Sequence, residues 1–185
     1  SQFSGDVITW TGAADTDWNL AANWDVNTVP TESNEVVIPS GLANYPTASS
    51  AVTVNSISLN SGSSLIAQDD FTGNVTYNRN IPNTNWYLIS SPVEGQDIDA
   101  FALDEGLAVG TGDNRGLSSY DNTIPTWAYY QNGATASGNF LKGEGKSLKL
   151  ATAGDVAFVG TMRTETETAV PLVVNANGLN LIGNP

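Results

Sequence analysis

Short alternating runs of apolar and polar residues dominate the chain and predict β-strands throughout. The clearest run spans residues 51–59, and its apolar members are Val52, Val54, Ile57 and Leu59. This period of two slips once at Asn55-Ser56, which predicts a bend between two consecutive short strands. Short strands joined by bends are typical of a β-solenoid rung, although a plain sandwich sheet also fits the pattern.

Beyond residue 70 the predicted strands are longer and are separated by Gly, Asn and Pro turns, as in antiparallel sheets. They are expected at residues 74–78, 86–90, 126–130, 146–150, 156–159 and 172–174. One helix is predicted, beginning near Asp97 and ending at Gly106. We therefore expect an all-β fold, with a short-strand β-solenoid-like region at residues 1–70 packed with an antiparallel β-sandwich-like region at residues 71–185.

Residues 86–92 and 179–185 echo each other, because each segment alternates, contains Leu-Ile and ends in Pro. The echo predicts two strands in one sheet, with Leu179 and Leu181 on a buried face of the sheet that holds Leu88. The chain stops at the second Pro, so we expect it to be truncated from a longer protein.

The charge of the chain is strongly acidic, with 19 acidic and six basic residues and a net charge of −13. Such a field repels phosphate backbones and anionic lipid headgroups, so nucleic acid is not an expected partner. No apolar run approaches the roughly 20 residues that cross a bilayer, so membrane insertion is not expected either. All the basic residues lie beyond residue 78, which leaves the acidic residues of the first region without a local partner.

The absence of Cys and His excludes thiol nucleophiles, Ser-His-Asp triads and nearly every protein zinc site. Composition still permits a glycosidase built on two carboxylates, or a polysaccharide lyase using Tyr129, Tyr130 and Lys142. The small size argues against both, and we expect no enzyme activity. Abundant Asn, Thr, Ser and Gly fit exposed extracellular β-structure, which predicts a secreted or cell-surface location.

A set of motifs covers nearly the whole chain. In the first region they are Trp10-Thr11-Gly12, Trp18, Asn23-Trp24, Pro30 and the segments 36–39, 52–56 and 59–62; in the second they are the segments 75–79, 86–92, 127–130 and 181–185. This combination resembles a β-rich module of large secreted and cell-surface proteins of Bacteroidetes, mainly flavobacterial substrates of type IX secretion. The resemblance implies export and a multidomain parent whose other domains are the partners of this one. It assigns no catalytic residue.

Aromatic residues are the first candidates for ligand binding, because their apolar faces stack on sugar rings. Trp10, Trp18 and Trp24 are expected to cap the open end of the first β-layer, although sugar stacking remains open for them. The better ligand-binding candidates are Tyr45, Trp127, Tyr129 and Tyr130. Tyr129 and Tyr130 point to opposite faces of a strand, so we expect at least one of them to be exposed.

Oxygen side chains at alternate positions suggest a calcium site in the first region. The segment fails as an EF-hand, since Leu20 and Val26 stand where the loop needs Gly and Glu. A looser Ca²⁺ site built from Asp15, Asp17 and Asp25 stays open beside the interpretation of these residues as solvated turns or caps.

Together these features predict a non-catalytic, extracellular structural or adhesive module of a larger secreted or cell-surface protein. The alternative is a carbohydrate-binding module attached to a glycan-degrading enzyme. A contiguous exposed strip of aromatic side chains with polar neighbours would favour the alternative, whereas buried aromatic residues would favour the first interpretation.

Overall fold

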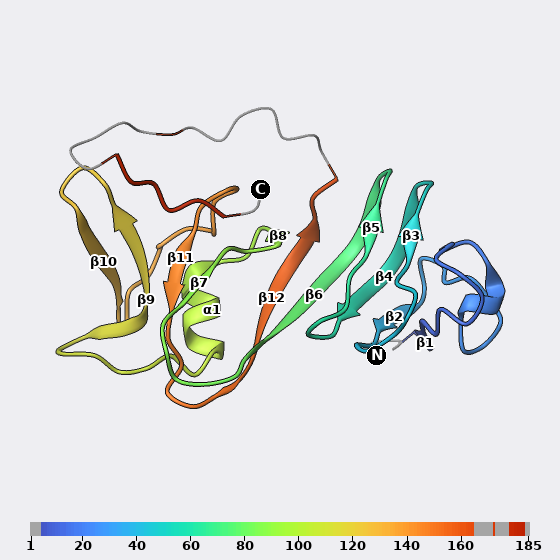
Figure 1. The fold of residues 1–185 in the computed structure, drawn as a ribbon, viewed down its shortest axis with the longest axis horizontal. Coiled ribbons are helices and arrows are strands. Elements are labelled where there is room, and N and C mark those ends of the chain that lie inside the picture. The colour runs from blue at the N-terminus through green and yellow to red at the C-terminus, as the bar shows by residue number, and fades with distance from the viewer. Residues whose placement is uncertain (1–4, 165–171, 173–177, 184–185) are drawn as a thin grey trace. The chain divides into compact units, whose positions relative to one another are not determined.

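The computed structural model describes residues 5–164, 172 and 178–183 (Figure 1). Strands account for 43% of the described residues and helices for 6%, so the all-β prediction is confirmed. The chain forms two compact units, unit 1 with residues 1–79 and 157–165, and unit 2 with residues 80–156 and 166–185. No helix within the described residues has the length and apolar character needed to cross a membrane.

Unit 1 is built on a sheet of parallel strands. Its parallel strands are β1 (Val7–Thr9), β2 (Glu35–Ile38), β4 (Val52–Leu59) and β6 (Phe71–Ile81), in that order. Strand β12 (Gly154–Met162), of which residues 157–162 belong to unit 1, follows β6 in the sheet order. A smaller parallel pair joins β3 (Thr47–Ala48) to β5 (Ile66–Ala67). The register places Val36 beside Ile57 and Ile57 beside Val75, and all three side chains are buried. The alternation seen in the sequence thus becomes a ladder of apolar side chains across neighbouring strands.

The predicted slip at Asn55-Ser56 is confirmed, but it lies within one strand and not between two. Strand β4 pairs with β6 through Thr53 and Thr72, and then again through Ser56 and Asn74, so β4 has one residue more than β6 in this interval. The extra residue is a β-bulge. Opposite it, Gly73 has φ +149°, and a Cβ there would lie 2.7 Å from the carbonyl oxygen of Val54.

Three tryptophans form a buried cluster in unit 1, as the capping interpretation predicts. Trp10, Trp18 and Trp24 are almost fully buried, and their rings meet edge to face with centroids 4.9 and 4.8 Å apart. Trp10 Nε1 donates a hydrogen bond to the Asn44 carbonyl, and Trp24 Nε1 donates to the Trp18 carbonyl. Rings that are almost fully buried offer no face to a sugar, so the sugar-stacking interpretation is wrong for these three residues. The short 3-10 helix η1 (Ala21–Asn23) leads into Trp24.

Unit 2 contains a four-stranded antiparallel sheet, which confirms the prediction of antiparallel pairing. Its order is β10 (Thr126–Gln131), β9 (Asn114–Asp121), β11 (Lys146–Leu148) and β7 (Tyr87–Ile89). Strand β8 (Val93–Glu94) and helix α1 (Ile98–Asp104) lie between β7 and β9 in the chain. The helix begins as predicted, because Asp97 caps it by accepting a hydrogen bond from the Ala100 amide. Most of the strand expected at residues 172–174 lies outside the described residues.

The echoed segment near the carboxyl end does not bury its leucines as expected. Leu88 and Leu179 are each 61% exposed, and Leu181 is half-buried. The segment nevertheless pairs with residues 143–145, since the Gly145 amide donates to the Leu181 carbonyl and the Gly183 amide to the Gly143 carbonyl. Backbone pairing therefore holds these residues while Leu179 remains in solvent, so the prediction of its burial is wrong.

Candidate functional site

Strand β10 brings three of the four predicted ligand-binding residues together in unit 2. Trp127 and Tyr129 are two residues apart and therefore share one face of the sheet, whereas Tyr130 points to the other face. Tyr45 belongs to unit 1 instead, where its hydroxyl donates to the Gly62 carbonyl at 3.2 Å. The structure thus groups Trp127, Tyr129 and Tyr130 on one strand and separates Tyr45 from them.

An exposed aromatic face covers one side of the four-stranded sheet, and we define it by Trp86, Tyr120, Trp127 and Tyr129. Trp86, Tyr129 and Trp127 are 46%, 39% and 38% exposed. The rings of Tyr120 and Trp127 lie 5.3 Å apart, and those of Trp86 and Tyr129 lie 6.0 Å apart. Trp86 was not among the binding candidates expected from the sequence, because it precedes β7 at the opposite edge of the sheet from β10 and its ring meets that of Tyr129 only in the folded chain.

Small residues in the middle of the sheet leave room for these rings. The register aligns Tyr129 with Ser118, Ser118 with Ser147, and Ser147 with Leu88 across the four strands. Both serines are buried. Since the two central positions of this row carry only hydroxymethyl groups, the large rings near the edges can lean over them toward each other.

A cleft of about 300 Å³ adjoins Tyr129 and Trp86, and we call it the aromatic cleft. Lys149 and Arg115 line it together with residues 108–111. Lys149 Nζ lies 5.9 Å from the centroid of the Trp86 ring, within the range of a cation-π contact. Arg115 Nη1 donates a hydrogen bond to the Asn114 carbonyl at 2.9 Å. The cleft therefore combines two aromatic walls with two cations.

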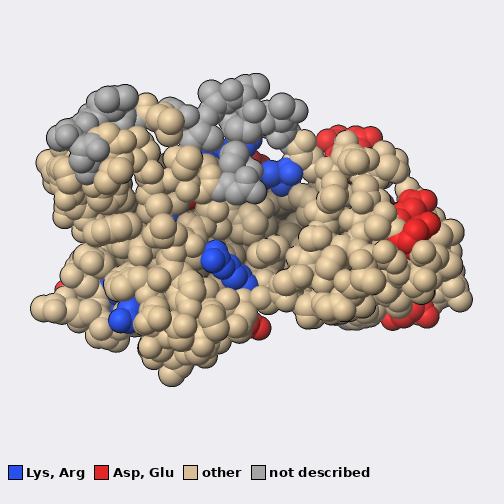
Figure 2. Space-filling view, viewed as in Figure 1, with Lys and Arg blue, Asp and Glu red and all other residues tan. Residues whose placement is uncertain are grey.

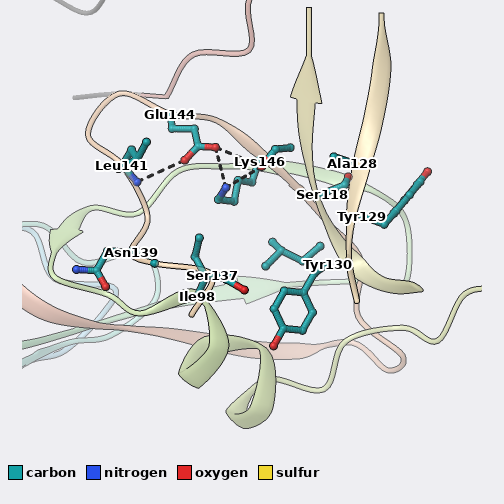
Figure 3. Close-up of a pocket in the computed structure, with 13 residues that line it drawn as sticks. Ile98, Ser118, Ala128, Tyr129, Tyr130, Ser137, Asn139, Leu141, Glu144 and Lys146 are labelled. Atoms are coloured by element: carbon teal, nitrogen blue, oxygen red, sulfur yellow. Dashed lines mark hydrogen bonds and ion pairs between the residues drawn. The ribbon is translucent and has the colours of Figure 1, made fainter. Parts of the chain in front are cut away.

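A second cavity, of about 410 Å³, lies on the opposite side of the sheet, and we call it the polar cavity (Figure 3). Lys146 Nζ donates to Glu144 Oε1 at 2.7 Å and to Ser119 Oγ at 2.8 Å. Ser119 Oγ in turn donates to Glu144 Oε1 at 3.2 Å, which closes a ring of three polar groups. The Lys146 side chain is only 6% exposed, so this ring compensates a buried charge.

The geometry of the ring gives Ser119 a bridging role. Its hydroxyl accepts from the Lys146 ammonium and donates to the Glu144 carboxylate. Ser119 is thereby held between an ammonium and a carboxylate that are bound to each other.

Tyr130 lines the polar cavity but is anchored at its hydroxyl end, which points toward helix α1 in Figure 3. The hydroxyl donates to Asp99 Oδ1 at 2.9 Å, and Asp99 also accepts from the amide and hydroxyl of Ser137. Hydrogen bonds from the Ser137 amide and hydroxyl hold the pKa of Asp99 below its ordinary value. Burial, followed by the hydrogen bond to Asp99, raises the pKa of Tyr130. Tyr130 therefore ties the loop at Ser137 to the helix and offers only part of its ring to a ligand.

The three aspartates predicted to bind calcium accept hydrogen bonds within the loops of unit 1. Asp15 Oδ1 accepts from the Asp17 amide and from Asn23 Nδ2, each at 2.8 Å. Asp17 Oδ1 accepts from the Asn19 amide, and Asp25 Oδ1 accepts from the Thr9 amide. The amide of Asp17, followed by the side chain of Asn23, holds the pKa of Asp15 below its ordinary value.

Asn23 is the centre of this network and was not singled out for it from the sequence. It is fully buried, and its Oδ1 accepts from the amides of Ala14 and Asp15 at 2.9 and 3.0 Å. Its Nδ2 donates to Asp15 Oδ1 and to the Asp17 carbonyl. Within residues 5–164, 172 and 178–183, no group of three or more acidic side chains is placed to hold a metal ion. The calcium site stays a prediction.

Comparison of the chain with protein-family models, with curated proteins and with solved structures finds no match.

Proposed function

We propose that the chain is a non-catalytic structural or adhesive module of a larger secreted or cell-surface protein, similar to the modules of such proteins in Bacteroidetes. In this proposal unit 1 is a solenoid-like spacer and unit 2 is a sandwich-like module that makes the external contact. The parallel ladder supports the first part, because Val36, Ile57 and Val75 meet after intervals of about 20 residues, a spacing typical of stacked repeats. The antiparallel sheet of unit 2 supports the second part.

Two observations carry this proposal. The buried tryptophan cluster of unit 1 supports the structural role, and the exposed aromatic face of unit 2 supports the external contact and at the same time favours the carbohydrate-binding alternative. Trp86, Trp127 and Tyr129 stay substantially exposed, whereas the three tryptophans of unit 1 are buried. Exposing large rings costs hydrophobic free energy, and grouped exposed rings are typical of surfaces that contact another molecule. Trp and Tyr also dominate the binding energy of many interfaces.

Adhesion of the purified chain tests this proposal. Beads coated with the chain should be retained on flavobacterial cells or on immobilised extracellular polysaccharide. A variant with Trp86→Ala, Trp127→Ala and Tyr129→Ala should lose most of this retention while keeping its melting temperature. A matched variant with Leu103→Ala, Ile124→Ala and Leu179→Ala removes exposed apolar side chains outside the aromatic face and the cleft beside it. Equal retention by both variants would show that the aromatic face makes no contact.

The second candidate function is carbohydrate binding on behalf of a glycan-degrading enzyme in the same parent protein. The specific observation in its favour is the aromatic cleft, where the rings of Trp86 and Tyr129 stand beside the polar residues Thr111 and Asn114. Sugar rings stack on aromatic side chains through their apolar faces, while amides and hydroxyls bind the sugar hydroxyls. A glycan array tests this function, with binding that disappears in Trp86→Ala as the expected result.

A further inference from the structure

We infer that the aromatic cleft binds an acidic saccharide, with a uronic-acid ring on Trp86 and Tyr129 and its carboxylate between Lys149 and Arg115. This inference rests on the carbohydrate-binding proposal and specifies the class of sugar. The two rings, the two cations and the cleft that they line are all part of unit 2.

The charge of the cleft is opposite to that of the chain. The chain carries a net charge of −13 and only six basic residues, yet two of the six line this one cleft. None of the ten residues that line the cleft is acidic. On the face that Figure 2 shows, the Lys and Arg side chains form isolated patches among uncharged atoms. A local positive site on an acidic protein selects an anionic ligand by charge complementarity.

The two cations are free to bind a ligand. In the described part of the chain neither Lys149 nor Arg115 forms an ion pair. Lys146 provides the internal contrast, because this buried lysine is bound to Glu144 at 2.7 Å. The guanidinium of Arg115 uses Nη1 for the Asn114 carbonyl, which leaves most of its five N–H donors available.

The backbone holds these side chains in a fixed frame. The Ala108 amide donates to the Lys149 carbonyl and the Gly116 amide donates to the Ala108 carbonyl, at 2.9 and 2.8 Å. The Lys149 amide donates to the Gly116 carbonyl at 2.7 Å. This close approach requires glycine, since a Cβ on Gly116 would lie 2.1 Å from the Lys149 carbonyl oxygen. The cations therefore project from a braced backbone, which lowers the entropy lost on binding.

A uronic acid fits this combination better than the other anions or neutral sugars. A neutral sugar would use the two rings and leave both cations unpaired. Inorganic phosphate would use the cations and leave the rings exposed. A uronic acid carries a carboxylate on the same pyranose whose apolar face stacks on an aromatic ring, and guanidinium groups bind carboxylates with two parallel hydrogen bonds.

The test compares oligomers of galacturonic acid with the same oligomers after methyl esterification, by isothermal titration calorimetry of the whole chain. The two probes share the sugar backbone and differ in charge. We expect the acid form to bind at least about tenfold more tightly than the ester, and Lys149→Met or Arg115→Gln to remove about tenfold in affinity for the acid form. Trp86→Ala should weaken both probes. Lys142→Met removes one positive charge outside the cleft and should change the affinity by less than about twofold.

Every other result of this binding test contradicts one particular part of the proposal. Equal binding of acid and ester, lost in Trp86→Ala and kept in Lys149→Met, would leave the carbohydrate-binding proposal intact and overturn the acidic specificity. An equal loss of affinity in Lys142→Met and Lys149→Met would show unspecific charge attraction, and would contradict binding in the aromatic cleft. If a neutral oligomer that carries sulfate groups bound more tightly than the galacturonic acid oligomer, the assignment of a uronic acid as the ligand would be wrong. Absence of binding to either probe and to every glycan of an array would overturn the carbohydrate-binding proposal itself.

Discussion

The tryptophans of the two units show how the same residue type takes opposite roles. In unit 1 Trp18 and Trp24 are buried, and the indole N–H of Trp24 is bound to a backbone carbonyl. In unit 2 Trp86 and Trp127 keep much of their surface in solvent, with an aromatic neighbour on one side only. The packing of the surrounding element therefore decides whether such a ring stabilises the fold or stays available for a ligand.

The largest difference between the units is expected in the free energy of unfolding when one tryptophan of each is replaced by alanine. Trp24→Ala should lower the free energy of unfolding by about 3–5 kcal/mol, because it removes a buried ring that packs on two others. Trp86→Ala should lower it by less than about 1 kcal/mol, since that ring is largely exposed. Urea unfolding followed by circular dichroism measures both values. Similar losses for the two variants would contradict the assignment of structural and ligand-facing roles.

The next largest effect on the free energy of unfolding is expected for the hydrogen-bonded group of Lys146, Ser119 and Glu144 in unit 2. Glu144→Ala should cost about 2–4 kcal/mol, because it leaves the buried ammonium of Lys146 without its carboxylate. The double variant Glu144→Ala with Lys146→Met should recover most of this loss, since it removes the uncompensated charge. Urea unfolding of the two variants checks this. A double variant no more stable than the single one would show that the carboxylate acts through some other contact.

The corresponding polar centre of unit 1 is Asn23. Asn23→Ala should lower the free energy of unfolding by about 1–3 kcal/mol, because it leaves buried amides of the loop without their acceptor. Asn19→Ala is the matched control, since its exposed side chain makes one hydrogen bond, to Ser50. Thermal melting of both variants would measure the difference, and equal melting temperatures would remove the central role of Asn23.

The smallest effect concerns acid stability, for which one carboxylate of each unit is compared. The pKa of Asp15 in unit 1 and the pKa of Asp99 in unit 2 are both lowered by hydrogen bonds that the folded chain donates. Each carboxylate therefore stabilises the fold above its unfolded pKa of about 3.9, and this contribution is lost as the pH falls through the lower folded value. Asp15→Asn and Asp99→Asn should each flatten the fall of the melting temperature below about pH 4.

Scanning fluorimetry across this acid range measures the effect. Asp104→Asn supplies the control, because this carboxylate is exposed and forms no hydrogen bond within the described residues. If the slope of melting temperature against pH changed as much in the control as in Asp15→Asn, the acid sensitivity would be due to net charge alone.

Local signals in the sequence predicted local features of the fold. The period of two located β4 and its slip, Asp97 marked the helix start, and the size of the tryptophans near the amino end indicated burial. Each of these depends on neighbours in the chain or on the chemistry of one side chain. Leu179 shows the limit, because its exposure depends on which surface lies beside it.

The candidate site was predicted only in part for the same reason. Tyr129 and Trp127 were found through their alternation on one strand, but the ring of Trp86 reaches that of Tyr129 across the folded sheet, from the side of the opposite edge strand. Lys149 and Arg115 reach the cleft from different strand ends, which no spacing along the chain indicates. Asn23 likewise stands in the sequence as an ordinary loop residue. The four hydrogen bonds of its side chain exist only in the folded loop.

The parallel ladder of unit 1 also governs the order in which that unit acquires its structure. The connections from β2 to β4 and from β4 to β6, residues 39–51 and 60–70, are of similar length, so adding each of these strands costs a similar loop-closure entropy. Growth of this kind starts at one pair of strands and proceeds by addition of the next neighbour. Because the ring of Trp18 packs on Phe71, the first residue of β6, the tryptophan cluster is completed only when β6 has joined. The residues synthesised earliest in this segment are therefore among the last to reach their final packing.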